Sequence, residues 1–417
     1  MTYTIDGKYN SAHVYASQLD DVTIGQITNL CNQEWLQDSH IAVMADAHAG
    51  KGCTVGTTIT LHGKVSPNLV GVDIGCGMLV VNLGKTPIDL ESLDKAITQN
   101  VPSGFSVHNQ PQMKLEAVKQ LRAYDFIKKP QHITQSLGTL GGGNHFIEVD
   151  RAGDGTHYLV IHSGSRNLGK QIADHYQDLA IQKLQSQRFD ISHKRRELIE
   201  DYKSQGRQSD IPQALEALNY HRETLSREEK DMAYLSGDDF NDYIHDMKLT
   251  QAYAVDNREH MANIIIKHLN SEQGFNLEPL SKKSNADFFH TIHNYIDTDT
   301  MILRKGAISA QVGELVIIPI NMRDGCILAH GKGEANANLS GPHGAGRQMS
   351  RRQAKENINL EHYQSQMEGI YTSSVNQSTL DEAPDAYKPI DVILEDIQDC
   401  VDVIEVIKPI YSFKSSN

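Results

Sequence analysis

The sequence predicts one elaborated domain, spanning residues 1–417, in which mixed strands and helices surround glycine-rich loops. Short apolar segments rich in β-branched residues run repeatedly into glycine-punctuated loops, which is typical of strands that carry sites at their ends. No internal repeat, low-complexity tract or clear interdomain linker divides the chain, although its length would allow two or three domains.

The composition is that of an ordinary globular protein. A net charge of −14 disfavours nonspecific nucleic-acid binding, but it does not exclude a local basic groove. The five cysteines are widely spaced and form no CxxC pair, which fits a reducing compartment. No apolar run reaches the ~18–20 residues of a membrane span, and the first residues do not resemble a signal peptide. We therefore expect a cytoplasmic protein without a membrane partner.

The first elements lead to a candidate site in the loop 46–52. Residues 1–35 predict a short strand and then a helix over 20–31. Residues 40–44 predict a buried strand, which opens into this polar loop and brings Asp46 to its start. A loop at a strand end suits a functional residue, and a simple turn is the alternative.

Asp73 and Cys76 lie three residues apart among glycines, inside the apolar segment 69–78. Burying both groups unpaired would be costly, and a metal held by a carboxylate and a thiolate would satisfy both. The alternative is a buried structural cysteine beside a turn aspartate. This segment alone does not decide between the two.

Residues 138–149 pass from a glycine run directly into a strand pattern. Asn144, His145 and Glu148 stand at this junction and are ligand or acid–base types. Three consecutive glycines would let a phosphate approach the backbone, but the GxxxxGK[ST] motif is absent. The preceding polar segment 101–135 shows no chemistry.

The middle of the chain combines one candidate ligand with helical scaffold. The strand 157–161 ends at His162, for which a hydrogen-bonded core histidine is the alternative. Amphipathic patterns predict a helix over 168–184 and a second long helix through 243–265. Between them, the charged segment 185–231 predicts an exposed helical hairpin without catalytic function.

The last third of the chain supplies a further pair of ligand types. His293 and Asn294 follow an apolar stretch. Residues 304–307 predict a basic turn, while a helix is predicted over 390–400 and a strand over 401–413.

Residues 340–347 place His343 between a proline and a glycine pair. Clustered backbone N–H groups cradle anions, and downstream arginines would add bidentate phosphate recognition. These arginines are Arg347, Arg351 and Arg352. A largely neutral imidazole in such a nest could be a nucleophile toward phosphorus. The alternative is a glycine-rich turn whose histidine caps a neighbouring element.

Together, the candidate metal ligands comprise one carboxylate, one thiolate and three imidazoles: Asp73, Cys76, His145, His162 and His293. They could hold two divalent ions if the thiolate bridges, and mixed O, N and S donors favour manganese or zinc over magnesium. Metals beside an anion nest would support displacement at phosphorus. The residues alone therefore indicate metal-assisted phosphoryl or nucleotidyl transfer.

Seven motifs extend this interpretation: DAHAGKG at 46–52, VDIGCGM at 72–78, GTLGGGNHFIEV at 138–149, HSGSR at 162–166, HN at 293–294, RKGA at 304–307 and PHGAGR at 342–347. With these motifs in this order, the chain resembles the RtcB-type RNA ligase family (3′-phosphate RNA ligases). The resemblance covers nearly the whole chain, except residues 101–135 and the charged insert at 185–231.

The resemblance implies an α+β fold with mixed sheets around a central metal and nucleotide cleft, two Mn²⁺ per chain, and GTP. His343 would attack the GTP α-phosphorus and form a guanylyl-histidine. The guanylyl group would pass to an RNA 3′-phosphate, formed where needed from a 2′,3′-cyclic phosphate, and an RNA 5′-hydroxyl would then seal the strand. The reaction would serve RNA repair or tRNA splicing, and an archease-like activator is a conceivable partner.

The resemblance also assigns roles to individual residues. Cys76 would bridge the metals, with Asp73 and His145 at one and His162 and His293 at the other. Asp46 matches an acidic residue near the metals and joins His343 in the catalytic set. The implied nucleotide contacts are Asn144, His145, Phe146, Ile147, Glu148, His293, Asn294, Pro319, Ile320, Asn321, Met322, Cys326, His343, Gly344, Ala345, Gly346 and Lys414.

The chain departs from the family pattern near the guanine pocket. Asn321 and Cys326 stand where nucleotide-contacting serines would be, and a cysteine thiol is a poor hydrogen-bond donor. Two alternatives to a ligase are a metal phosphoesterase that processes cyclic-phosphate RNA ends and a non-catalytic RNA-end-binding protein on a ligase scaffold. The presence of His343 and of every metal ligand argues against the second.

Overall fold

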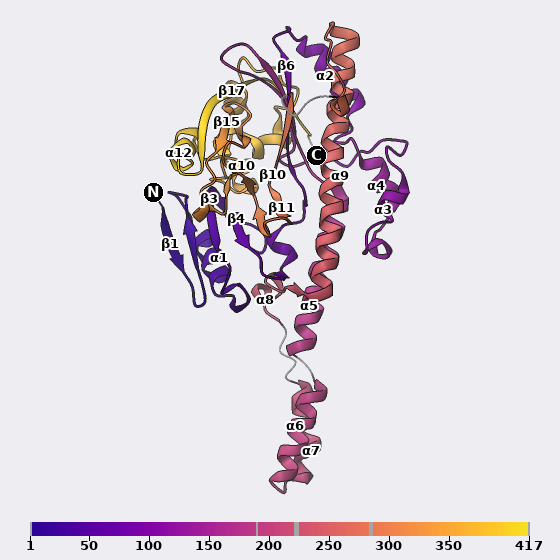
Figure 1. Cartoon of the computed structure of the whole chain (residues 1–417), viewed down its shortest axis with the longest axis vertical. Coiled ribbons are helices and arrows are strands. Elements are labelled where there is room, and N and C mark those ends of the chain that lie inside the picture. Colours follow the sequence, from indigo (N-terminus) through magenta and orange to yellow (C-terminus); the bar gives the residue numbers. More distant parts are fainter. Residues whose placement is uncertain (1, 189–190, 221–224, 283–286, 416–417) are drawn as a thin grey trace.

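The computed structural model describes residues 2–188, 191–220, 225–282 and 287–415 (Figure 1). Two large sheets form the body of the molecule, and helices cover them. Among the described residues, no helix is both long and apolar enough to cross a membrane.

The first sheet has six strands, and all neighbours are antiparallel except β2 and β3. In spatial order the strands are β1 (Tyr3–Asp6), β2 (Ser11–Val14), β3 (Ile41–His48), β4 (Val55–Thr60), β12 (Ile302–Lys305) and β11 (Asn294–Asp297). This sheet brings the start of the chain beside a segment from its last third.

The second sheet has seven antiparallel strands. In spatial order these are β10 (Phe288–Ile292), β6 (Gly77–Gly84), β8 (His157–Ser163), β7 (Phe146–Arg151), β17 (Val401–Lys414), β15 (Gly325–Gly331) and β14 (Leu315–Asn321). Two short ribbons pair β13 (Ala307–Ser309) with β16 (Ser340–Pro342), and β5 (Lys64–Val65) with β9 (Leu235–Ser236).

The helices range from single turns to one very long element. They are α1 (Asp21–Cys31), α2 (Leu90–Asn100), α3 (Leu115–Val118), α4 (Pro130–Ser136), α5 (Arg166–Arg188), α6 (Ile191–Ser204), α7 (Ile211–Tyr220), α8 (Arg227–Asp231), α9 (Gly237–Gln273), α10 (Arg351–Asn357), α11 (Leu360–Gln366) and α12 (Ile390–Asp396). Helix α9 runs the length of the body in Figure 1. It ends at Gly274, whose φ of 74° gives the left-handed conformation that commonly terminates a helix.

The alternation of side chains along β7 gives the seven-stranded sheet two different faces. Ile147 and Val149 pack with residues of α9 such as Met261 in one apolar cluster. Phe146 points to the opposite face and joins a separate apolar cluster with Ile317. Because side chains alternate with a period of two, Glu148 and Asp150 also belong to this second face.

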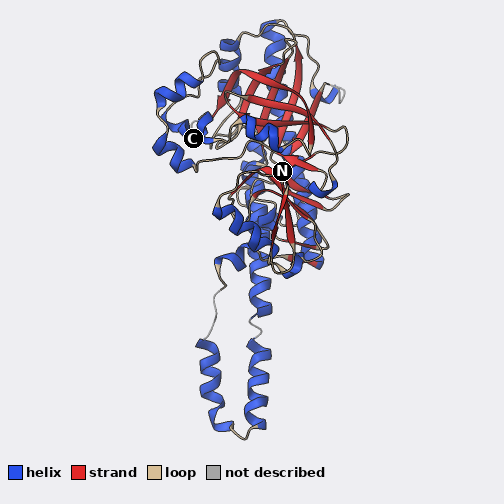
Figure 2. Ribbon diagram, turned by 90° about the vertical axis from the view of Figure 1, so that its left-hand side faces the viewer, coloured by secondary structure: helices blue, strands red, loops and turns tan. Residues whose placement is uncertain are grey.

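The charged insert is helical, as its sequence predicts. Helices α6 and α7 pack against each other and extend away from the body beyond the end of α5 (Figure 2). The links 189–190 and 221–224, which fall within the predicted hairpin, lie outside the described residues.

The structure confirms the predicted α+β class, although only the six-stranded sheet is mixed, and it corrects two local predictions. Asp46 was expected in a loop, but β3 continues through His48 with an irregular register after Val43. Residues 304–307 were expected to form a basic turn. Instead, Arg304 and Lys305 lie in β12 and are buried.

Candidate active site

Strand register brings the candidate metal ligands together. Gly77 pairs with Ser163 and with Ile292, so Cys76, His162 and His293 lie near the same end of three neighbouring strands. Phe146 pairs with His162, which places His145 beside them. Segments that are far apart in the sequence therefore converge where four neighbouring strands of the seven-stranded sheet, β10, β6, β8 and β7, have their ends.

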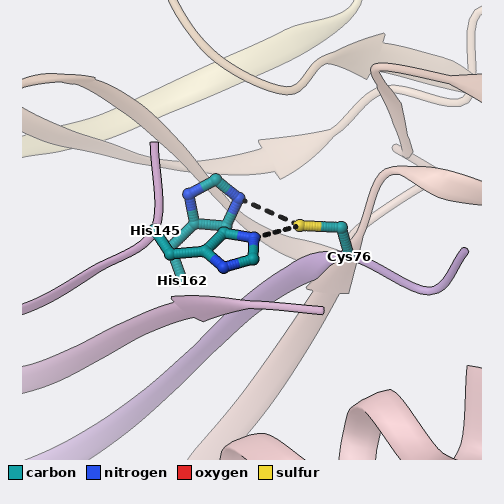
Figure 3. Close-up of side chains that lie close together, drawn as sticks. All are labelled: Cys76, His145 and His162. Carbon is teal, nitrogen blue, oxygen red and sulfur yellow. Dashed lines mark hydrogen bonds between the residues drawn. The ribbon is translucent and has the colours of Figure 1, made fainter. Parts of the chain in front are cut away.

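The side chains at this edge form what we call the central cluster: Asp73, Cys76, His145, His162 and His293. The Cys76 Sγ lies 3.4 Å from His145 Nε2 and 3.3 Å from His162 Nε2. Figure 3 shows both imidazole rings directed toward this sulfur. His145 Nε2 is also 3.0 Å from an Asp73 carboxylate oxygen, and His162 Nε2 is 3.4 Å from His293 Nε2. The structure thus brings together all five predicted ligands.

Backbone carbonyls fix the histidine rings in a ligand-like orientation. His145 Nδ1–H donates to the Leu140 carbonyl at 2.9 Å, and His162 Nδ1–H donates to the Asn144 carbonyl at 3.1 Å. In this tautomer each Nε2 carries a bare lone pair that faces the thiol. Metal-binding histidines are commonly held in this way through their other ring nitrogen.

The electrostatics of the central cluster fit a bound cation. Burial lowers the pKa of His162 and of His293 well below the usual value, so both imidazoles are neutral and free to coordinate. Burial and the neighbouring Asp73 raise the pKa of the Cys76 thiol. A cation at this point would stabilise the thiolate and separate lone pairs that otherwise face each other.

A buried arginine that sequence patterns did not single out supports the central cluster. Arg258 of α9 has no exposed surface and donates to the carbonyls of Gly75 and Ser163, at 2.9 and 2.8 Å. Both carbonyls adjoin ligand-bearing segments. The predicted scaffold helix therefore also positions the loop of Asp73 and Cys76.

His343 lies next to the central cluster and is oriented by Asp46. Its ring centroid is 4.6 Å from that of His293. His343 Nδ1 is 2.5 Å from an Asp46 carboxylate oxygen, which also accepts from the His343 backbone N–H at 3.1 Å. With Nδ1–H donated to Asp46, the lone pair on Nε2 is available as a nucleophile.

The glycines around His343 permit this close approach. Gly346 has a φ of 74°, and a Cβ there would come within 2.3 Å of the Asp46 carbonyl oxygen. A side chain at this position would therefore displace β3 from the nest.

A cavity of about 270 Å³ opens beside His343. Most of the predicted nucleotide contacts line it, namely Asn144, Phe146, Glu148, Pro319, Ile320, Asn321, Met322, His343, Gly344, Ala345, Gly346 and Lys414. The cavity is therefore walled by β7, β14, β17 and the glycine-rich nest.

Five predicted contacts do not line the cavity, and two of them, His145 and His293, belong to the central cluster. Ile147 packs in the core on the other face of β7. Cys326 is fully buried in an apolar cluster. Asn294 donates to the Asp73 carbonyl and accepts from the Gly306 N–H, so it holds two site loops together.

The far wall of the cavity contains a charged group that the motifs did not reveal. Glu382 accepts from Lys414 Nζ, Arg351 and the Tyr387 hydroxyl at 2.8, 2.8 and 2.7 Å. Arg347 also approaches it, at 3.5 Å. Lys414 and the arginines had been singled out from the sequence, but Glu382 had not, because it lies in a segment without a motif.

The third arginine that the sequence pointed to lies elsewhere. Arg352 is exposed and forms an i,i+4 ion pair with Glu356 at 2.8 Å. It does not line the cavity. His48, in contrast, lines the cavity although it was not selected from the sequence.

Comparisons with known proteins agree with this geometry. A family model described as "tRNA-splicing ligase RtcB" matches residues 26–128 and 121–415. The RNA-splicing ligase RtcB of Escherichia coli (strain K12) is 30% identical over 403 residues, covering 90% of each chain. The tRNA-splicing ligase RtcB of Aeropyrum pernix is 26% identical over 447 residues, with 90% of this chain and 87% of that protein covered. The chain belongs to the RtcB family.

Proposed function

We propose that this chain is an RNA ligase that uses GTP and Mn²⁺ to join an RNA 3′-phosphate or 2′,3′-cyclic phosphate end to a 5′-hydroxyl end. The observation that carries the proposal is the position of His343. Its imidazole is oriented by Asp46, lies beside the central cluster and forms part of the cavity wall. Relatives named RNA-splicing and tRNA-splicing ligases support the same class of reaction.

The nucleophile in this proposal is His343 Nε2. It attacks the α-phosphorus of GTP, a P–N bond forms, and the bond to the pyrophosphate leaving group breaks. The guanylyl group then passes to an RNA 3′-phosphate oxygen, and attack by a 5′-hydroxyl of the second RNA end releases GMP. Covalent activation supplies the leaving group that a phosphate monoester lacks.

The central cluster is the proposed Mn²⁺ site, with Cys76 shared between two ions. Asp73 and His145 would complete one coordination shell, and His162 and His293 the other. Bound cations would offset the negative charge that develops at phosphorus. The mixture of carboxylate, imidazole and thiolate donors suits manganese better than magnesium.

The wall formed by Lys414 and Asn321 is the proposed guanine-binding surface. Lys414 Nζ is fixed by Glu382 at 2.8 Å and therefore presents a positioned donor to the cavity. Asn321 also lines the cavity, and its side-chain nitrogen is 2.9 Å from an Asp324 carboxylate oxygen. Both groups can hydrogen-bond a base.

Labelling with GTP tests the covalent step. The protein is incubated with Mn²⁺ and GTP that carries ³²P at the α-phosphate, and then resolved by denaturing electrophoresis. We expect label on the wild type and none on His343→Ala. The exposed His330 provides a matched control, since His330→Ala should keep the label.

The same preparations distinguish the ligase from a phosphoesterase. Absence of label on folded, metal-loaded wild type would contradict the proposal. Hydrolysis of a cyclic-phosphate RNA end without sealing would instead indicate an end-processing phosphoesterase. A comparison of turnover with and without an archease-like activator tests the expected partner.

The unpaired, buried cysteines fit the expected cytoplasmic location.

A further inference from the structure

A second group of side chains of metal-ligating types adjoins the cavity, and we call it the carboxylate–thiol cluster. It consists of Glu148 and Asp150 from β7 and Cys326 from β15. One ligand atom from each residue lies within 4.8 Å of the other two. The cluster shares no residue with the central cluster, and the proposed ligase reaction does not use Asp150.

These three groups are held in an apolar environment. Cys326 packs with Val160, Ile317 and Ile407 on the face of the seven-stranded sheet that carries Phe146. Asp150 and Cys326 have no exposed surface, and Glu148 is 3% exposed. A buried carboxylate without a partner costs several kcal/mol, so such groups are normally paired, protonated or bound to a metal.

The hydrogen-bonding needs of the carboxylates are largely unmet. Neither side-chain oxygen of Asp150 has a hydrogen-bond partner among the described residues. Glu148 accepts from the Ser412 hydroxyl at 2.8 Å through one of its oxygens. Within the part of the chain that the structure describes, the fully buried Asp150 carboxylate therefore has only the Cys326 thiol, a weak donor, as a close partner.

We propose that Glu148, Asp150 and Cys326 bind a thiophilic divalent cation of the Zn²⁺ class. Zinc accepts thiolate and carboxylate ligands, and three protein ligands leave its fourth position open. Glu148 also lines the cavity, so the open position would adjoin the cavity. A cation there would interact with the Asp150 oxygens, which have no hydrogen-bond partner among the described residues. It would also balance the negative charge of the ligands, which the apolar surroundings do not offset.

Cation uptake at this cluster displaces protons. Burial raises the pKa of Glu148 to about 7, and burial followed by the charge of Glu148 raises the pKa of Asp150. Burial and then Asp150 raise the pKa of the Cys326 thiol. Because the ligands bind metal in their deprotonated forms, affinity should increase as the pH rises through 7.

Cobalt provides a direct probe, because a Co²⁺–thiolate bond gives a near-ultraviolet charge-transfer band. Full-length Cys76→Ala, which removes the thiol of the central cluster, is titrated with Co²⁺ alone. We expect a thiolate band, which Cys76→Ala/Cys326→Ser loses and which Zn²⁺ displaces. Cys76→Ala/Cys400→Ser should retain it, since Cys400 is an equally buried cysteine outside both clusters.

Single variants that keep Cys76 test the proposal even if the Cys76→Ala protein misfolds. Among these variants, Cys326→Ser should remove roughly half of the thiolate band, and Asp150→Asn should weaken cobalt binding at least tenfold at the Cys326-dependent site. An unchanged band in Cys326→Ser, or a Cys76→Ala protein that folds without any thiolate band, would overturn the proposal. Neither readout requires ligase activity, so the outcome is independent of the proposed function.

Discussion

One carboxylate oxygen of Asp46 holds His343 at two points, through the ring Nδ1 at 2.5 Å and the backbone N–H at 3.1 Å. Asp46 is fully buried, and its other oxygen has no hydrogen-bond partner among the described residues. The nearby Lys388 donates to the Ala45 and Ala47 carbonyls at 3.2 Å and so holds the same part of β3. The direction of the His343 ring therefore depends on a strand from the start of the chain.

Replacing Asp46 by asparagine should impair guanylylation while leaving the fold intact. The amide keeps the size of the carboxylate but loses the charge that favours the required tautomer and stabilises the ring as it becomes positive. We expect the rate of α-phosphate labelling to fall by about 10²–10⁴-fold. The exposed Asp125 supplies the control, and equal rates for Asp46→Asn and Asp125→Asn would refute the orienting role.

Gly346→Ala should destabilise the protein more than a change in backbone conformation alone explains. Gly346 and Gly313 both have a φ of 74°, but only at Gly346 would a Cβ meet other atoms. The left-handed conformation costs about 1–2 kcal/mol at each position. The clash with Asp46 should add roughly 1–3 kcal/mol for Gly346→Ala. Denaturant unfolding of Gly346→Ala and Gly313→Ala measures the difference between their losses in the free energy of unfolding. This difference should vanish if β3 does not contact the nest.

Cys76→Ala should abolish Mn²⁺ binding throughout the central cluster, because the thiolate is proposed to bridge both ions. His293→Ala, in contrast, should remove ligands from only one ion. Elemental analysis after dialysis measures the bound manganese, and a Cys326→Ser background excludes any contribution from the carboxylate–thiol cluster. Retention of two ions by the Cys76→Ala protein would disprove the bridge.

Glu382→Gln should lower the free energy of unfolding by about 3 kcal/mol at pH 7, because it leaves Lys414 buried without its anion. Burial alone would raise the pKa of Glu382, but Lys414 and Arg351 overcome this effect and lower it. A lowered pKa stabilises the fold above the ordinary value of 4.5, and this contribution is lost as the pH falls through the folded-state value.

Denaturant unfolding at pH 7 and near pH 4 tests the direction of this pH dependence. The difference in the free energy of unfolding between wild type and Glu382→Gln should become smaller at the lower pH. Glu361→Gln is a suitable control, since Glu361 is exposed. A difference that grows on acidification would contradict the assignment of Lys414 as the stabilising partner.

The residues of the central cluster could be singled out from the sequence because each stands at a strand end or beside glycines. Cys76 adjoins the start of β6 and His162 lies near the end of β8, so local patterns placed both correctly. Their convergence depends on the pairing of β6 with β8, which no local pattern specifies. The ordered motifs supplied that missing information through resemblance to a family.

Other features depend on contacts between distant segments. Arg304 was assigned to a basic turn, but it lies in a strand and is buried, because Ser340 and Asn338 supply acceptors from another part of the chain. Glu382 lacks a local motif, and only the fold brings Lys414 to it. Asp46 was assigned to a loop because an irregular strand register cannot be read from alternation.

Strand β17 pairs with β15 through its first half and with β7 through its second half, and Pro409 lies where the register shifts. A ribosome makes the chain from its N-terminus, so the central cluster and His343 are synthesised before this strand. A nascent chain that stops before Val401 already contains every proposed metal ligand but not Lys414. The cavity wall that holds Lys414 against Glu382 can therefore form only after residue 414 has been synthesised. During translation, the proposed metal ligands are thus present before the proposed nucleotide pocket can be completed.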